Sequence, residues 1–117
     1  MNPFDYGLCG QTVTLYRKDG EQMIRQVVEH AYLSEKRATP AESFGKSLEK
    51  KFQLIIPGDI PLEPGDRVFR GIGPLSVDWQ QFVPALVDGL YECSFVKPCY
   101  WENEITHWEA GNRKETL

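Results

Sequence analysis

The sequence predicts a mostly-β fold: a small antiparallel β-barrel of five or six strands with a long loop between the second and third strands. Two observations lead to this prediction. Short segments rich in alternating apolar, β-branched and aromatic residues recur along the 117-residue chain. Glycine and proline separate these segments, and short strands divided by such turns are typical of small barrels and sandwiches. A chain of this length is expected to form one domain around one hydrophobic core.

The first two strands are expected to form a hairpin. Residues 11–18 alternate apolar and polar side chains, which is the pattern of a strand with one buried face. The Asp-Gly pair at 19–20 favours a tight turn, because glycine tolerates a positive φ. The apolar residues of 22–33 also permit a helix, but the preceding turn and the two valines at 27–28 favour a second strand with a bulge.

Shorter segments complete the predicted barrel. Strands are expected at 52–56, 67–70, 90–97 and 104–109. Pro64 and Gly65 fit the centre of a type II turn, in which proline sets the first φ and glycine takes the positive one. A short helical turn is expected within 77–87, limited by Pro84. The domain is expected to span 1–110, followed by a polar C-terminal tail at 111–117.

A long polar loop is predicted at 34–51. It contains five basic and three acidic side chains, and only Phe44 and Leu48 are large and apolar. Those two side chains cannot offset the conformational entropy lost by ordering the segment, at roughly 1–2 kcal/mol per residue. We therefore expect the loop to be mobile in a free monomer and ordered in an assembly, since long loops in compact domains are commonly functional.

Charge and hydropathy exclude several classes of protein. The net charge of −4 and the pI of about 5.2 argue against a dedicated nucleic-acid binder, which carries a basic face. No apolar run approaches the roughly 20 residues that span a bilayer, and no signal peptide is recognisable. Three cysteines fit a reducing compartment better than a disulfide framework. We therefore expect synthesis in a cytoplasm and no membrane association.

The residues that could carry catalysis or bind a metal form no recognised motif. A cysteine–histidine nucleophile pair would need His30 or His107 beside a thiol, and lone histidines on strands are more often surface or satisfied core residues. Metal binding by Cys93, Cys99 and His107 would use a spacing found in no common zinc signature, so free thiols are the alternative. We predict no enzymatic activity, no cofactor and no bound metal.

Two further groups of residues have both a structural and a functional interpretation. Asp59 and Asp66 flank a proline-glycine turn, where carboxylates usually accept local hydrogen bonds instead of acting as acid–base pairs. An aromatic group could form a platform for carbohydrate or peptide, or could pack in the core and between subunits. Its members are Trp79, Tyr100, Trp101 and Trp108.

The order of these segments resembles a known family. An Asp-Gly hairpin and a polar excursion are followed by Phe-Gln-Leu-Ile-Ile-Pro at 52–57, Pro-Gly-Asp-Arg-Val at 64–68 and Thr-His-Trp-Glu at 106–109. Over residues 11–110 this layout resembles the small neck proteins of tailed bacteriophages and prophages. The class in question is the head-closure or stopper class, with its minor-capsid relatives.

The resemblance implies a β-barrel that assembles as a homo-oligomeric ring in the virion, between the portal or adaptor and the tail. In the better-known stoppers a long loop between early strands points into the central channel and helps to hold the DNA in. The loop at 34–51 lies in the corresponding place, which implies contact with a partner protein or non-specific contact with packaged DNA. The candidate partner-facing or channel-facing residues are Lys36, Arg37, Phe44, Lys46, Leu48, Lys50 and Lys51.

Two other interpretations stay open from the sequence. A tail completion protein would show much the same pattern of segments. A free-standing bacterial domain that binds a small ligand or acts as an enzyme would also form a small barrel. Concentration-dependent assembly, and neighbouring genes for capsid or tail proteins, would favour the phage role.

Overall fold

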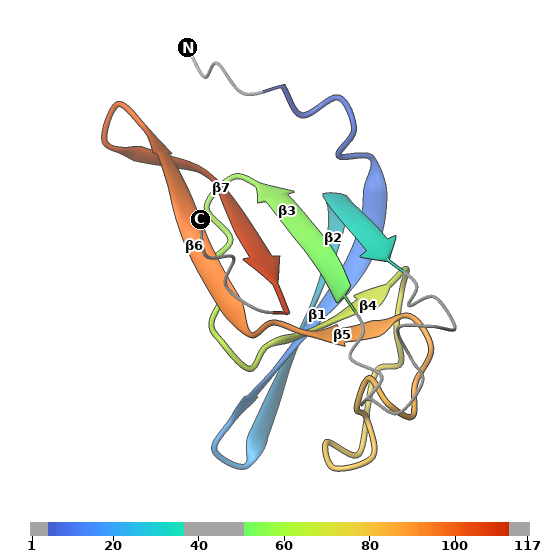
Figure 1. The fold of residues 1–117 in the computed structure, drawn as a ribbon. Coiled ribbons are helices and arrows are strands. Elements are labelled where there is room, and N and C mark those ends of the chain that lie inside the picture. The colour runs from blue at the N-terminus through green and yellow to red at the C-terminus, as the bar shows by residue number, and fades with distance from the viewer. Residues whose placement is uncertain (1–4, 37–50, 113–117) are drawn as a thin grey trace.

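The computed structural model describes residues 5–36 and 51–112, and within them it contains seven β-strands and no helix (Figure 1). The strands are β1 (Gln11–Asp19), β2 (Gln22–Lys36), β3 (Lys51–Pro57), β4 (Arg67–Arg70), β5 (Leu90–Glu92), β6 (Phe95–Trp101) and β7 (Glu104–Gly111). The described residues hold no helix long and apolar enough to cross a membrane.

The seven strands form one antiparallel sheet in the order β5-β4-β1-β2-β3-β7-β6, curved into a half-barrel (Figure 1). The predicted closed barrel of five or six strands is therefore wrong in strand number and in closure. The strand predicted at 90–97 is two strands, because the chain changes partner between them. Cys93 N donates to Asp66 O next to β4, whereas Ser94 N donates to Gly111 O in β7, both at 2.8 Å.

Strand β2 joins two halves of the sheet, one formed by β5, β4 and β1 and the other by β3, β7 and β6. Its residues 22–31 pair with β1, and its residues 32–36 pair with β3. The register between β1 and β2 shifts between Gln11 and Val13, which leaves one extra residue in β2. The predicted bulge is thus confirmed, and bulges bend and twist the strand that carries them. The bulge lies just before β2 changes partner.

The predicted loop between the second and third strands is shorter than expected. Residues 34–36 belong to β2 and Lys51 belongs to β3, because Ser34, Glu35 and Lys36 continue the ladder with β3. Residues 37–50 lie outside the described part of the chain. The expected mobility of the loop therefore stays a prediction.

Both tight turns predicted from the sequence are present in the structure. Gly20 has a φ of 62° at the first central position of the β1–β2 turn, as a type II′ turn requires. Gly65 has a φ of 95°, and Asp66 N donates to Glu63 O at 3.0 Å. The type II turn predicted from the proline-glycine pair is therefore confirmed.

The two aspartates near that turn differ in their partners. Asp66 Oδ2 accepts from Glu63 N at 2.9 Å, so the local turn hydrogen bond is confirmed for Asp66. Its two carboxylate oxygens also accept from Arg17 at 2.8 Å each, and Asp66 is only 3% exposed. Asp59 instead accepts from the indole Nε1 of Trp108 at 2.9 Å, which ties the turn after β3 to β7.

Hydrophobic side chains pack on both faces of the sheet. Alternation within β3 directs Phe52, Leu54 and Ile56 into the half-barrel, where they join the inner core. The outer core is built by Tyr16, Phe82 and Leu90. The inner core comprises Val13, Leu15, Val28, Ala31, Leu33, Phe52, Leu54, Ile56, Leu62, Val68, Tyr91, Cys93 and Ala110. Both faces of β1 are therefore covered, which explains why four successive residues of it are buried.

The segment 71–89 covers the outer core and is fixed by Arg67. The guanidinium Nη1 of Arg67 donates to the carbonyl oxygens of Trp79 and Phe82, both at 2.6 Å. The guanidinium carbon lies 3.8 Å from the centre of the Trp79 ring, an attractive cation–π geometry. Phe82 N donates to Asp78 O at 2.8 Å and Val87 N donates to Val83 O at 3.0 Å, so the expected helical turn is present as two successive single turns.

Candidate functional site

The N-terminal part of β2 has a partner on only one side among the described residues. Residues 22–31 pair with β1, but β3 joins β2 only from Tyr32 onward. The β1–β2 hairpin consequently projects from the rest of the sheet (Figure 1). We call the unpaired side of residues 22–31 the open edge.

The register shows which backbone groups face the open edge. In a two-residue hairpin turn the flanking pair, here Asp19 and Gln22, exchanges both hydrogen bonds, and such pairs then alternate along the ladder. The same alternation places the carbonyl of Thr12 toward β4, and Thr12 O accepts from Gly71 N at 2.8 Å. The N–H and C=O groups of Met23, Arg25 and Val27 therefore point to the open edge.

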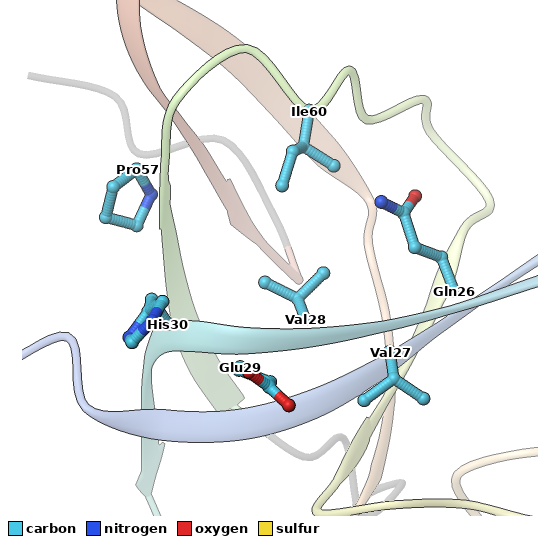
Figure 2. A pocket seen from close by; sticks show the side chains of 7 residues that line it. All are labelled: Gln26, Val27, Val28, Glu29, His30, Pro57 and Ile60. Carbon is cyan, nitrogen blue, oxygen red and sulfur yellow. The ribbon is translucent and has the colours of Figure 1, made fainter.

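A hollow of about 370 Å³ lies beside the open edge (Figure 2). Val28 and Ile60 form its apolar side, and both pack against the inner core. Glu29 and His30 are exposed at its end. The full lining is Gln26, Val27, Val28, Glu29, His30, Pro57 and Ile60. An unpaired strand next to an apolar hollow can accept an extended chain, whose backbone pairs with the edge and whose side chain enters the hollow.

The structure separates the site residues predicted from the sequence. Lys36 and Lys51 are register partners at the ends of β2 and β3, away from the residues that line the hollow. The other predicted partner-facing residues lie outside the described ranges; they are Arg37, Phe44, Lys46, Leu48 and Lys50. The open edge was missed, because period-two patterning shows that a segment is a strand but not which of its sides lacks a neighbour.

The four aromatic residues considered as a platform do not form one group. Trp79 packs in the outer core beneath Arg67, and Trp108 packs against the inner core. Tyr100 and Trp101 are 57% and 40% exposed at the end of β6. The packing interpretation therefore holds for Trp79 and Trp108, and only the pair on the β6–β7 hairpin remains available to a partner.

A second cluster of polar side chains lies on the β6–β7 ladder. Cys99 and His107 are register partners, and Glu109 lies two residues further along β7 on the same side. The thiol of Cys99 donates to Glu109 Oε2 at 3.3 Å, and His107 Nε2 lies 2.9 Å from the same oxygen. The phenol oxygen of Tyr6 is 2.7 Å from His107 Nδ1 and covers the ring, which is buried.

This cluster differs from the metal ligand set considered from the sequence. Cys93 lies in the inner core, where burial raises the pKa of its thiol, so it does not join Cys99 and His107. Glu109 takes that place. The spacing of His107 and Glu109 on one strand could have indicated a shared face, but the register that brings Cys99 beside them is a tertiary contact that sequence patterning does not reveal.

The electrostatics of the cluster do not activate Cys99 as a nucleophile. Burial and the hydrogen bond to Glu109 raise the pKa of Cys99 to about 11, so the thiol is protonated at neutral pH. Burial raises the pKa of Glu109 too, but hydrogen bonds from His107 and Cys99 and the charge of Lys97 outweigh it and lower that pKa. A cysteine nucleophile needs a lowered pKa, whereas burial and the hydrogen bond to Glu109 shift the pKa of Cys99 in the opposite direction.

Comparison of the chain with protein-family models, with curated proteins and with solved structures found no match.

Proposed function

We propose that this chain is a structural protein that acts by assembling with copies of itself, as a ring in the neck of a tailed phage or prophage particle. The ring would lie between the portal or adaptor and the tail. The phage role rests on the resemblance of segment order over residues 11–110. The assembly role rests on one structural observation, the open edge of β2.

The open edge of β2 is better suited to strand addition than the edges of β5 and β6, the two end strands of the sheet. An unpaired strand edge is a template for another strand, and proteins that avoid such pairing use short edge strands, proline or lysine. At the ends of the strand order, β5 has only three residues, and β6 carries Lys97 and Pro98. Residues 22–31 contain neither proline nor lysine and follow a regular ladder up to the bulge.

A ring also constrains how the edge is used. Rotational symmetry of a ring requires each copy to present two different surfaces, one to each neighbour. The open edge and its hollow would be one of them. Exposed apolar residues elsewhere could form the second; in the described part of the chain they include Ile72, Leu75 and Leu86 in 71–89, and Tyr100 and Trp101 on the β6–β7 hairpin.

The assembly role is tested by one substitution at the open edge. Val27→Pro removes an N–H that faces the edge and leaves the ladder with β1 intact, so the variant should still fold. We expect its assembly midpoint, measured by analytical ultracentrifugation and native mass spectrometry, to rise roughly tenfold or more, because each interface loses a backbone hydrogen bond and gains a steric block. Val27→Thr keeps the β-branched shape and the N–H, and it should assemble like the wild type.

Two outcomes would contradict the assembly role. One is a wild-type chain that stays monomeric at all concentrations, and the other is equal assembly of the proline and threonine variants. The neck role has a separate test, since genes for capsid and tail proteins should flank the gene for this chain. A position among genes of cellular metabolism would contradict the neck role and leave the assembly result standing.

A further inference from the structure

Contrary to the sequence-based expectation of no bound metal, we propose that Cys99, His107 and Glu109 form a binding site for a divalent cation of the zinc class, on the β6–β7 ladder. The inference does not depend on the proposed function, because it uses a different part of the molecule. It rests on the spacing of three ligand atoms, on the support of the histidine ring and on the chemistry of the donor set.

Two of the three spacings between the ligand atoms, both to Glu109 Oε2, are close to those of a tetrahedral site. Zinc bonds of about 2.0–2.3 Å at tetrahedral angles place neighbouring ligand atoms roughly 3.3–3.6 Å apart. Here Cys99 Sγ lies 3.3 Å and His107 Nε2 lies 2.9 Å from Glu109 Oε2. All three ligand atoms lie within 4.8 Å of one another. The Cys99 thiol and the His107 ring nitrogen, within 4.8 Å of each other, would have to approach by up to about 1 Å to admit the ion.

Tyr6 supplies the support that a ligating histidine needs. Histidine ligands usually place their second ring nitrogen in a hydrogen bond that fixes the tautomer and the ring orientation. The Tyr6 hydroxyl lies 2.7 Å from His107 Nδ1, and the two rings meet edge to face with centroids 5.4 Å apart. On metal binding the ring proton would lie on Nδ1 and be donated to the Tyr6 oxygen, and Nε2, which hydrogen-bonds to Glu109 in this structure, would bind the ion instead. His107 is 3% exposed, so its ring is held in place before any ion arrives.

The donor set selects the class of ion. Thiolate, imidazole and carboxylate together suit zinc and its neighbours in the transition series, whereas magnesium and calcium require oxygen ligands. The Cys99 thiol would release its proton to solvent on binding, as metal-bound thiols do. Three protein ligands leave the fourth tetrahedral position for water or for a group from a partner.

One neighbouring charge opposes the cation. Lys97 Nζ lies 3.8 Å from Glu109 Oε1 and pairs with the carboxylate that the metal would use. The Lys97 side chain is 58% exposed, so it can turn into solvent when the ion binds. Removal of this ammonium in Lys97→Ala should therefore tighten metal binding.

The test uses cobalt(II) as a spectroscopic probe on the full-length protein, after chelator treatment under reducing conditions. One equivalent of cobalt(II) should give a thiolate-to-cobalt absorption band, and zinc should displace it. Cys99→Ser should abolish the band and weaken zinc binding at least roughly tenfold, and Tyr6→Phe should weaken it by a smaller factor. Cys9→Ser is the matched control, because its thiol lies outside the cluster, and it should retain the band.

A second measurement needs no variant and covers the case in which a substitution unfolds the chain. Zinc should slow alkylation of Cys99 in the wild-type protein at least tenfold and leave Cys9 unaffected, as read by peptide mass spectrometry. The proposal is overturned if cobalt(II) gives no thiolate band. It is equally overturned if zinc leaves the alkylation rate of Cys99 unchanged.

Discussion

Tyr16 and Gly73 show how a single contact positions a long segment. Tyr16 is fully buried, and its hydroxyl donates to Pro74 O at 2.7 Å, which holds the start of 71–89 against β1. Thr14 on the same face donates to Gly71 O at 2.7 Å and accepts from Gly73 N at 2.9 Å. The chain passes so close that a Cβ on Gly73 would lie 2.3 Å from the Tyr16 hydroxyl oxygen.

We predict that Gly73→Ala destabilises the fold by about 1–3 kcal/mol, the usual cost of an overpacked site. The added methyl would displace the Tyr16 hydroxyl from Pro74 and press on the Phe69 ring, 3.0 Å away. Urea unfolding followed by tryptophan fluorescence gives the free energy of unfolding. Gly10→Ala is the control, because a Cβ there meets no atom within 4 Å. Equal stability of the two variants would show that the Gly73 contact can relax without cost.

The elements differ in how far their own sequence determines them. Local alternation of apolar and polar residues was enough to predict the strands at 11–18, 22–33, 52–56 and 67–70. Local turn chemistry was likewise enough to predict the turn at Pro64 and Gly65. The division of 90–97 was not, since it depends on a change of hydrogen-bonding partner at Cys93 and Ser94.

The open edge and the Cys99 cluster were unpredictable for a related reason. Both depend on which strands become neighbours, and pairing across distant parts of the chain leaves no periodic pattern in the sequence. The partner-facing residues that the resemblance indicated, by contrast, were chosen only because they lie in a polar segment between two predicted strands. Only Lys36 and Lys51 of that set fall within described strands.

The alternation along β2 leads to a prediction for amide hydrogen exchange. In dilute monomer the amides of Met23, Arg25 and Val27 should exchange at least roughly tenfold faster than those of Ile24 and Gln26, which bond to β1. The difference should shrink on assembly as a neighbouring strand covers the edge. Nuclear magnetic resonance resolves the individual amides. Uniform protection of all five in the monomer would mean that the edge is already covered.

At the scale of the whole molecule, a cluster of side chains connects the end of β2 to β5 across the half-barrel. Glu35 accepts from the Tyr91 hydroxyl at 2.5 Å and from Arg70 Nη1 at 2.8 and 2.9 Å. The rings of Phe52 and Tyr91 pack with centroids 5.0 Å apart. These contacts join strands that are not neighbours in the sheet, and so they maintain its curvature.

This cluster predicts a loss of stability in alkali. Burial, and then the hydrogen bond to Glu35, raise the pKa of Tyr91 above its usual 10.0. The stabilisation is complete below about pH 10 and falls as the pH rises further, because the unfolded chain ionises while the folded chain stays neutral. Tyr91→Phe should be about 1 kcal/mol less stable at pH 7. Its free energy of unfolding should then fall less steeply than that of the wild type above pH 10. Parallel slopes in chemical denaturation would contradict this explanation.

The division of β2 between two partners also bears on how the chain folds. The β1–β2 hairpin can form early because its residues are close in sequence, but the β1–β4 and β3–β7 ladders join residues 50 to 58 positions apart. Bringing such distant residues together costs loop-closure entropy before their contacts form, so these pairings limit the folding rate. Since β2 pairs with β1 in one half of the sheet and with β3 in the other, neither half has a complete template without it, and we expect the two halves to be gained or lost in a single cooperative step.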